Sequence, residues 1–586
     1  MYLEKINSPA DVKELSYQEM KSLAAEMRQA LITKVSNHGG HFGPNLGMVE
    51  MTIAMHYVFN SPEDKIVYDV SHQSYPHKML TGRKDAFLDA AKYDDVTGYT
   101  NPKESEHDFF TIGHTSTSVS LASGLAKGRD LLGGKDNIIA VIGDGSLSGG
   151  EALEGLDFIP ELQSNMIVIV NDNDQSIAEN HGGLYRNLKE LRESNGTAEN
   201  NFFKALGYDY YYLEDGHDIE KLIALFEQVK DTDHAVLLHI HTIKGKGYKI
   251  AEEDREAWHA SGPFNIEDGK PKFSIPNVES YESITKEYLT NLLTTREDTV
   301  AITAGTPMVM GFTEDVRPTL PKGKLIDVGI AEEQAVAMAS GIAKNGGTPV
   351  FGVFSPFLQR TYDQLSSDLC LNNNPAVLLV FLASVYGMNS DTHLGIFDIP
   401  MISHIPNLVY LAPTSKEEYV AMLNYATTQK EHPIAIRVPV GELRTTGVED
   451  TTDYSKLNQY EVTKKGSDAA IIGLGNFYGL AEQIADKFKE ETKKELTVIN
   501  PKFITGLDEA LLERLKADHK VVITLEDGIV EGGFGQTIAG FYGPSDVKVK
   551  NYGIKKSFPT DYVAAELLKE NGISVEQIVN DLKELL

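Results

Sequence analysis

The chain has almost no cysteine, because Cys370 is the only one in 586 residues. An intrachain disulfide and a cysteine metal cluster are therefore excluded, and a reducing compartment suits the chain. Long apolar runs are also missing, and the first residues, MYLEKINSPADVKELSYQEM, lack the basic start and apolar core of a signal peptide. We therefore expect a cytoplasmic protein without a membrane partner.

Basic residues are in the minority, with 54 Lys and Arg against 85 Asp and Glu, which gives a net charge of −31. No run of Lys and Arg offsets this charge, so nucleic acid is excluded as a general partner, as are anionic membranes. Small anionic substrates are not excluded, since a few cations in a cleft override the field of the whole protein.

Short apolar, β-branched runs recur along the chain and predict buried parallel strands. They are NIIAVIGDG, MIVIVNDND, HAVLLHIHT, DTVAITAG, AVLLVFLAS, NLVYLAP, PIAIRVP, AAIIGLG, LTVINP and VVITLED. Amphipathic stretches of helical spacing separate them, among them SLASGLAKGRDLL, EEQAVAMASGIAKNG, EEYVAMLNYATTQ and LAEQIADKFKEET. This alternation predicts α/β domains.

Two polar stretches are candidate linkers. The first is SGPFNIEDGKPKFSIPNVESYE, residues 261–282, and the second is VEDTTDYSKLNQYEV, residues 448–462. The chain is too long for one hydrophobic core. We therefore predict three domains, residues 1–270, 280–447 and 460–586.

The strongest local motif is Gly143, Asp144 and Gly145 after the run IIAVI, followed by Asn171, Asp172 and Asn173 after the run IVIV. Mg²⁺ prefers oxygen ligands, and one carboxylate and one amide at the ends of neighbouring strands supply them. Each motif alone is more often a turn or a loop. The pair, with Asn about thirty residues after GDG, matches the thiamine-diphosphate motif.

Further segments resemble 1-deoxyxylulose-5-phosphate synthase, a transketolase-like enzyme family, over nearly the whole chain. They include SNHGGHFGPNLGMVE, YDVSHQSYPHKMLTGRKDAF, IGHTSTSVSLASGLAKGRD, IKGKGYKIAE, DVGIAEEQAVAMASG, FLQRTYDQ, DTHLGIFDIP and EGGFG. The resemblance implies three doubly wound parallel-sheet domains of the thiamine-diphosphate fold and a homodimer. It also implies thiamine diphosphate and Mg²⁺ as cofactors, with pyruvate and an aldehyde as substrates.

The resemblance also implies a set of cofactor residues. It assigns Mg²⁺ to Asp144, Asn173 and the backbone carbonyl of Gln175. The residues expected to bind the cofactor are His72, Gly113, His114, Thr115, Gly145, Ser146, Asn173, Ile177, Tyr248, Glu332 and Phe357. Ile177 would lie under the bend of the cofactor and Phe357 would stack on its aminopyrimidine. A lone Ile or Phe is equally well explained as a core residue.

Catalytic roles are implied for one glutamate and four of the 17 histidines. Glu332 aligns with the glutamate that shares a proton with N1′ of the aminopyrimidine, which prepares the cofactor to lose its C2 proton. The adjacent Glu333 cannot face the same ring from a helix. His41, His72, His259 and His393 would donate hydrogen bonds or relay protons.

The expected acceptor site departs from the family pattern. Arg360 is retained and, with Lys244 and Asn389, is assigned to substrate binding, although Lys244 could equally be a solvated loop lysine. Leu382 and Val440 stand where the family has arginine, and Asn389 stands where it has aspartate. A phosphate dianion is normally held by arginine, so the identity of the acceptor aldehyde stays open.

Three functions are therefore compatible with the sequence. The first is the synthase reaction, in which pyruvate loses CO₂ and its remaining carbons join glyceraldehyde 3-phosphate to give 1-deoxyxylulose 5-phosphate. The second is a transketolase-like or acyloin-forming enzyme with another aldehyde acceptor. The third is a non-catalytic paralogue, against which the retained Glu332, Asp144 and Asn173 argue.

Overall fold

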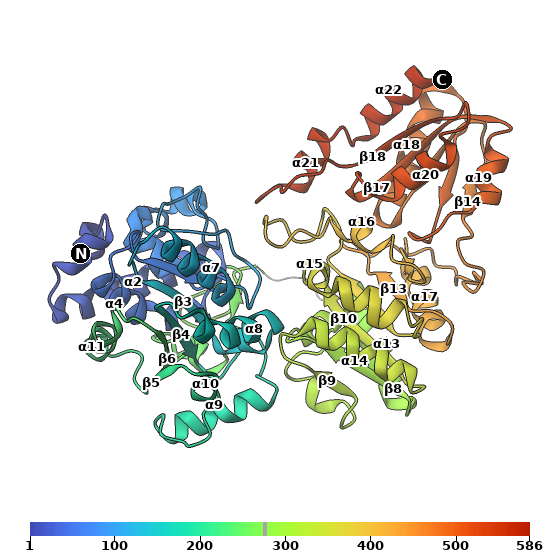
Figure 1. Cartoon of the computed structure of the whole chain (residues 1–586). Coiled ribbons are helices and arrows are strands. Elements are labelled where there is room, and N and C mark those ends of the chain that lie inside the picture. Colours follow the sequence, from blue (N-terminus) through green and yellow to red (C-terminus); the bar gives the residue numbers. More distant parts are fainter. Residues whose placement is uncertain (274–277) are drawn as a thin grey trace. The chain divides into compact units, whose positions relative to one another are not determined.

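The computed structural model describes residues 1–273 and 278–586, and within them the chain forms two compact units (Figure 1). Unit 1 contains the residues up to the 274–277 gap together with Gly329–Ala331. Unit 2 contains Val278–Val328 and Glu332–Leu586. Residues 274–277 belong to the first predicted linker, which therefore lies partly outside the described residues.

Unit 1 is built around a five-stranded parallel sheet in the order β2-β3-β4-β6-β5. Its strands are β2 (Lys65–Tyr68), β3 (Ile138–Gly143), β4 (Met166–Asp172), β5 (Asp209–Leu213) and β6 (Ala235–His241). A separate antiparallel pair joins β1 (Gly40–His41) to β7 (Ala260–Ser261). The crossovers in strand order are those of a doubly wound sheet.

Helices cover both faces of this sheet because successive strand residues point to opposite sides. Ile139 and Val141 pack in one apolar cluster, with helices α2 (Tyr17–His38), α4 (Val49–Val58) and α11 (Ile219–Val229). Ala140 and Ile142 pack in another, with α7 (Ser118–Leu131), α8 (Gly150–Phe158) and α9 (Gly183–Glu193). Continuous apolar runs therefore form the centre of the sheet.

Unit 2 contains two sheets. The first has the order β12-β13-β11-β10-β8-β9 and is entirely parallel. Its strands are β8 (Thr299–Thr303), β9 (Leu325–Asp327), β10 (Thr348–Phe354), β11 (Val377–Phe381), β12 (Val409–Leu411) and β13 (Ile434–Arg437). Helices α13 (Tyr281–Thr295) and α17 (Lys416–Thr428) cover one face, and α14 (Glu332–Lys344) and α16 (Asp398–Ile402) the other.

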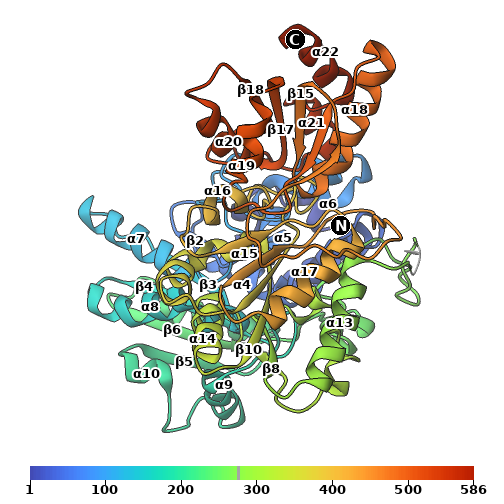
Figure 2. The same cartoon turned by 90° about the vertical axis from the view of Figure 1, so that its right-hand side faces the viewer.

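The second sheet of unit 2 has the order β14-β16-β15-β17-β18. Its strands are β14 (Glu461–Lys464), β15 (Asp468–Gly473), β16 (Thr497–Asn500), β17 (His519–Ile529) and β18 (Lys548–Ile554). Figure 2 shows α18 (Tyr478–Thr492), α21 (Ala564–Glu570) and α22 (Val575–Leu585) on one side and α19 (Glu509–Leu515) and α20 (Phe534–Tyr542) on the other. The edge strand β14 is antiparallel to β16, as edge strands of such sheets often are.

The two sheets of unit 2 share one apolar cluster. It contains Phe351 and Val380 from the first sheet and Ile472 and Val522 from the second. Continuous burial across both sheets explains why they form one compact unit, since a shared core couples the elements that line it. Each of the three predicted domains contains one sheet of five or six strands, the first also contains the β1–β7 pair, and the exact boundaries stay a prediction.

Every apolar run named above forms a strand, in chain order β3, β4, β6, β8, β11, β12, β13, β15, β16 and β17. The four amphipathic stretches form α7, α14, α17 and α18. The α/β prediction is therefore confirmed. The remaining helices are short, namely α1 (Pro9–Lys13), α3 (Gly43–Gly47), α5 (Tyr75–Lys78), α6 (Asp85–Leu88), α10 (Phe202–Leu206), α12 (Lys249–Glu253) and α15 (Ser355–Leu358). Outside residues 274–277, no helix is both long and apolar enough to cross a membrane.

Candidate active site

Two neighbouring strands of unit 1 bring together the predicted metal ligands. Gly143 at the end of β3 is paired with Asn171 near the end of β4, so Asp144 and Asn173 follow at the same edge of the sheet. The carboxylate Oδ2 of Asp144 accepts hydrogen bonds from the backbone N–H of Gln175, at 3.0 Å, and from Nδ2 of Asn180, at 2.6 Å. Asn180 is a member of this cluster that the sequence motifs do not identify.

The electrostatics of this cluster fit a cation. Burial, reinforced by the charge of Asp172, raises the pKa of Asp144 to about 8. The Oδ1 atoms of Asn173 and Asn180 are buried and have no hydrogen-bond partner among the described residues. Acidic and amide oxygens in this state are suitable ligands for a hard divalent cation such as Mg²⁺. The side chains of Asp144 and Asn173 are therefore compatible with a Mg²⁺ site, and the full ligand set stays a prediction.

Asp172 differs from Asp144 because it has its own partners. Its Oδ2 lies 2.7 Å from Nε2 of His239 and 2.6 Å from Nη1 of Arg192. Burial opposes ionisation, but these two partners lower the pKa of Asp172 to about 2. Asp172 therefore stays charged, supports β4 through its neighbours, and adds the negative field that Asp144 experiences.

Lys244 lies beside this cluster and is 1% exposed, so it is not a solvated loop residue. Its Nζ donates a hydrogen bond to the carbonyl of Ser176 at 2.6 Å. Burial lowers the pKa of Lys244 to about 7, although attraction to Asp144 opposes that shift. A buried lysine near a buried carboxyl is suited to binding an anionic group.

Three of the four predicted histidines form one cluster. The rings of His41 and His72 lie 5.1 Å apart, those of His72 and His259 lie 5.1 Å apart, and those of His41 and His259 lie 5.8 Å apart. The β1–β7 pair brings His41 opposite Ala260 and so joins distant segments. Asn45 fixes two of them, since its Nδ2 donates to the carbonyls of His41, at 3.0 Å, and His72, at 2.8 Å.

The surroundings of His41 and His259 favour their neutral forms at pH 7. Burial of the ring lowers the pKa of His41 to about 4. Burial and the nearby Lys244 cation lower the pKa of His259 well below its ordinary value. A neutral imidazole offers one N–H donor and one acceptor, so the cluster can bind a substrate oxygen or transfer a proton.

The loop that contains Gly113, His114 and Thr115 is held against the end of β3. Asp69 accepts hydrogen bonds from the backbone N–H of Ser116, at 2.8 Å, and of Ser118, at 2.9 Å. The hydroxyl of Ser116 donates to the carbonyl of Ser146 at 2.8 Å. The predicted cofactor residues Gly113, His114, Thr115, Gly145 and Ser146 thus belong to two linked loops. Asp69 is a second organising residue that the motifs do not identify.

Gly145 occupies a position that tolerates no side chain. A Cβ atom there would lie 2.9 Å from the side chain of Ser176, closer than real contacts allow. Ser176 is followed by Ile177, whose carbonyl accepts a hydrogen bond from Nε2 of Gln175 at 3.2 Å. The close approach explains the second glycine of GDG, because it lets the Gln175–Ile177 segment meet the end of β3.

Tyr248 packs inside an aromatic group in unit 1. Its ring lies 5.4 Å from Phe42, 5.3 Å from Trp258 and 5.8 Å from Phe264. Its hydroxyl donates to the carbonyl of Ile266 at 2.9 Å. These contacts give Tyr248 a structural role in holding the 258–266 segment, and its contact with a cofactor stays a prediction.

Unit 2 holds the remaining predicted residues. Glu332 begins α14 and is 2% exposed. Its Oε2 is buried without a hydrogen-bond partner in the part of the chain that the structure describes, and Nη1 of Arg360 is 3.7 Å away. Burial raises the pKa of Glu332 to about 7. The ring of Phe357 lies 5.5 Å from that of His393, whose Nδ1 is 2.9 Å from the hydroxyl of Thr392.

The residues that replace the family's acceptor arginines lie on two loops of unit 2. Leu382 follows β11 with a φ of +54°, a backbone conformation that is rare for leucine. Nδ2 of Asn389 donates to the carbonyl of Tyr562 at 3.1 Å. The backbone N–H of Val440 donates to Oδ1 of Asn476 at 3.2 Å.

A buried ion network supports both of these loops. Arg437 donates to Asp398 at 2.8 Å and pairs with Asp527. Asp527 also accepts hydrogen bonds from Ser384, at 2.5 Å, and Asn476, at 2.8 Å. Because Arg437 is committed to two carboxylates, it does not replace the missing acceptor arginines.

Family models match three regions of the chain. The model described as 1-deoxy-D-xylulose-5-phosphate synthase matches residues 3–201 and 194–242. The transketolase pyrimidine-binding domain matches residues 280–446, and the transketolase C-terminal domain matches residues 458–578.

Full-length relatives carry the name of the first model. The chain is 39% identical to the 1-deoxy-D-xylulose-5-phosphate synthase of Listeria monocytogenes, over 100% of this chain and 97% of the relative. It is 38% identical to that of Shouchella clausii, over 100% and 99%. A crystal structure of transketolase from Campylobacter jejuni matches 97% of this chain and 100% of its own, at 18% identity and a TM-score of 0.45, which is too low to support an argument.

The raised pKa of Glu332 predicts how its replacement changes stability. In the unfolded chain this carboxyl titrates near its ordinary value, whereas in the folded chain it titrates near pH 7. Between about pH 4.5 and pH 7 the folded state therefore keeps a proton that the unfolded chain has lost, so the free energy of unfolding falls by roughly 3 kcal/mol over this range. Above pH 7 the folded parent buries a carboxylate and the loss is complete. Glu332→Gln should be more stable than the parent at pH 8 and about equal at pH 5, measured by urea unfolding without cofactor. The partly exposed Glu333→Gln is the matched control, and an equal gain at both pH values would contradict the assignment.

Proposed function

Because the chain belongs to the 1-deoxy-D-xylulose-5-phosphate synthase family, we propose that buried polar groups of unit 1 bind the metal and the diphosphate of thiamine diphosphate, and that buried groups of unit 2 bind its aminopyrimidine. The chain is a transferase of the transketolase class, and its function is the condensation of pyruvate with glyceraldehyde 3-phosphate to 1-deoxy-D-xylulose 5-phosphate and CO₂. This activity belongs to isoprenoid biosynthesis. The observation that carries it is the identity with named synthases over the whole chain.

Asp144, Asn173 and the carbonyl of Gln175 are the proposed Mg²⁺ ligands. The support is the buried Oδ1 of Asn173, which lacks a hydrogen-bond partner among the described residues, and the raised pKa of Asp144. Lys244 and the loop of Gly113 to Thr115 are proposed to bind the diphosphate beside the metal. A lysine ammonium and backbone N–H groups are suited to phosphate oxygens.

Thiamine diphosphate, when bound, supplies the carbon nucleophile that attacks the keto carbon of pyruvate. Glu332 is proposed to hold a proton at its carboxyl and exchange it with N1′ of the aminopyrimidine, because its pKa of about 7 allows both protonation states near neutral pH. Phe357 would pack on the same ring. His41, His72 and His259 would donate hydrogen bonds to substrate oxygens.

The assembly and location of the protein also belong to the proposal. The homodimer that the resemblance implies and the cytoplasmic location expected from the sequence stay predictions. Support for the location is the low cysteine content.

Asp144→Ala tests the metal assignment. In the parent, Mg²⁺ and thiamine diphosphate together should raise the melting temperature, because they bind only the folded site. Asp144→Ala should abolish this rise, since it removes the only carboxylate among the proposed ligands. Calorimetry measures both variants, and the exposed Asp174→Ala is the control. If Asp144→Ala bound the pair of ligands as tightly as the parent, the metal site would lie elsewhere.

Glu332→Gln tests the proton assignment. The variant should fold and bind the cofactor, yet exchange the C2 proton of the bound cofactor for deuterium much more slowly, because glutamine cannot take part in proton transfer. NMR of rapidly quenched samples measures this exchange. Glu333→Gln should exchange at the parental rate. Parental exchange in Glu332→Gln would remove Glu332 from the mechanism.

A different aldehyde acceptor is a second candidate function, and the loops of Leu382 and Val440 favour it. Both residues are apolar, and the nearby Arg437 is occupied by Asp398 and Asp527. Arg360 is the remaining predicted phosphate partner, and it lies 3.7 Å from Glu332. The supply of cations for an acceptor phosphate is therefore smaller than in the family pattern.

Acceptor kinetics decide between the two candidates. Each missing arginine contact should cost on the order of 1.5–3 kcal/mol, so two should lower kcat/KM for glyceraldehyde 3-phosphate by roughly a hundredfold or more. In the variant Leu382→Arg, Val440→Arg, kcat/KM for glyceraldehyde 3-phosphate should rise strongly relative to that for glyceraldehyde. In the neutral control Leu382→Gln, Val440→Gln, this ratio should not change. A parent that already prefers the phosphorylated triose strongly, with no gain from the arginines, would eliminate the second candidate.

A further inference from the structure

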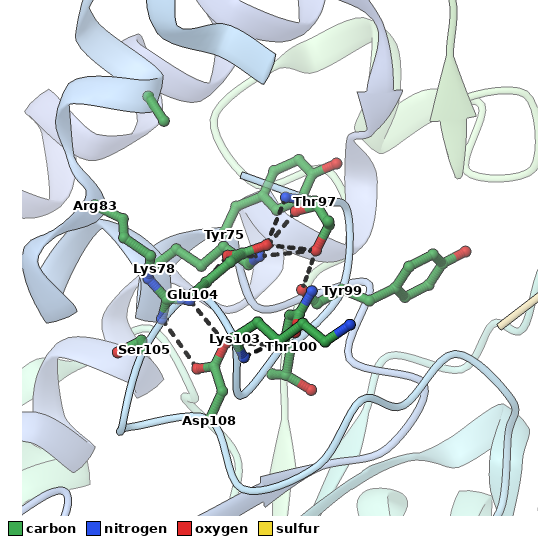
Figure 3. Close-up of polar contacts among 12 residues, drawn as sticks. Tyr75, Lys78, Arg83, Thr97, Tyr99, Thr100, Lys103, Glu104, Ser105 and Asp108 are labelled. Carbon is green, nitrogen blue, oxygen red and sulfur yellow. Dashed lines mark hydrogen bonds and ion pairs between the residues drawn. The ribbon is translucent and has the colours of Figure 1, made fainter. Parts of the chain in front are cut away.

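The segment Thr97–Asp108 contains no helix or strand, yet side-chain carboxylates hold it in place (Figure 3). Glu104 accepts hydrogen bonds from the backbone N–H of Thr97, at 2.7 Å, and from its hydroxyl, at 2.6 Å. Asp108 accepts the backbone N–H of Asn101 at 2.8 Å. The two carboxylates therefore fix both ends of the short stretch from Thr97 to Asn101.

Basic side chains of α5 and of the segment Met79–Arg83 after it hold these carboxylates. Glu104 lies 2.6 Å from Nζ of Lys78 and 3.1 Å from Nη1 of Arg83. Asp108 lies 2.7 Å from Nη1 of Arg83 and 2.9 Å from Nε2 of His77. The side chains of Lys78 and Asp108 are fully buried. Buried pairs of matched charge contribute little net stability but impose a specific geometry, so this network positions the segment.

Tyr99 lies in the middle of the fixed stretch. The hydroxyl of Thr97 donates to the carbonyl of Tyr99 at 2.9 Å, and the backbone N–H of Thr100 donates to the hydroxyl of Ser71 at 2.8 Å. Figure 3 shows the Tyr99 side chain pointing away from the ion pairs. Its ring lies 5.6 Å from that of His41, with an interplanar angle of 63°. Tyr99 is therefore the fourth ring of the cluster of His41, His72 and His259.

A cavity of about 220 Å³ lies along the same segment. Its lining includes Gly40 and Gly98, the chain neighbours of His41 and Tyr99, but none of the four rings. The contact between the rings of Tyr99 and His41, and not this cavity, therefore places Tyr99 at the candidate site.

We propose that Tyr99 contacts the substrate beside His41, and that Glu104 and Asp108 are positioning residues that hold Tyr99 there. The inference rests on the proposed function, since it names a further residue for that reaction. A phenol hydroxyl can donate one hydrogen bond and accept another, so an oxygen of the 2-oxo acid or of the aldehyde is a suitable partner for it. The ring also limits how His41 can turn, because edge-to-face contact has a preferred geometry.

Tyr99→Phe tests the contact, since it keeps the ring and removes only the hydroxyl. Its KM for pyruvate or for the aldehyde should rise about tenfold, with kcat little changed and cofactor binding unaltered in calorimetry. Binding of pyruvate to the holoenzyme, followed by calorimetry, should weaken to a similar extent if pyruvate is the partner. Tyr99→Ala should raise this KM further, because it also removes the ring that packs against His41.

A double-mutant cycle tests the positioning role. Glu104→Gln should raise the same KM as Tyr99→Phe, and the two changes together should raise it clearly less than the product of the single effects, because both act through one hydroxyl. Glu106→Gln, an exposed change on the same segment, should leave KM unchanged. If Glu104→Gln does not fold, Thr97→Val replaces it in the cycle. Thr97→Val removes the hydroxyl that joins Glu104 to the Tyr99 carbonyl.

The outcomes separate the two proposals. A parent that forms no product from pyruvate and any aldehyde would overturn the proposed function. An active parent in which Tyr99→Phe retains parental KM values for both substrates would overturn the contact made by Tyr99. Strictly multiplicative effects of Glu104→Gln and Tyr99→Phe would overturn the positioning role.

Discussion

Burial of a carboxyl group without a full counter-charge is the constraint on which the candidate residues of both units depend. Asp144 is 1% exposed and Glu332 is 2% exposed. Burial raises their pKa values to about 8 and about 7. In each unit the fold holds a group whose ionised form needs a partner, and a divalent cation or a ring nitrogen is such a partner. The surrounding strands and helices serve to keep these carboxyls out of water.

Other buried charges in the chain show the contrast. Asp172 is paired with His239 and Arg192, and Arg437 is paired with Asp398 and Asp527. Charges matched in this way fix geometry, whereas an unmatched carboxyl favours the binding of a ligand. The paired charges hold the loops in place, whereas Asp144 and Glu332 are the carboxyls proposed to bind a ligand or transfer a proton. The ion pairs behind Tyr99 belong to the first kind.

Much of the fold followed from local pattern. Runs such as MIVIVNDND and AVLLVFLAS are apolar without alternation, which is typical of strands buried on both faces, and they form β4 and β11. The named runs leave out other strands, among them β5 and β18, whose sequences DYYYL and KVKNYGI mix aromatic or charged residues with few aliphatic ones. Their pairing with β6 and β17 is decided by neighbours in the sheet, which local propensity does not contain.

The sequence by itself determined the motif residues of the site, because Asp144, Asn173, Glu332 and the histidines lie in short motifs of recognisable spacing. Only the tertiary structure decided the protonation states of these residues and which side chains lie beside them. The β1–β7 pair places His41 beside His259, a fold of the chain buries Lys244, and two carboxylates bring Tyr99 to His41. Burial and electrostatic coupling depend on contacts between distant segments, so no local pattern of residues encodes them.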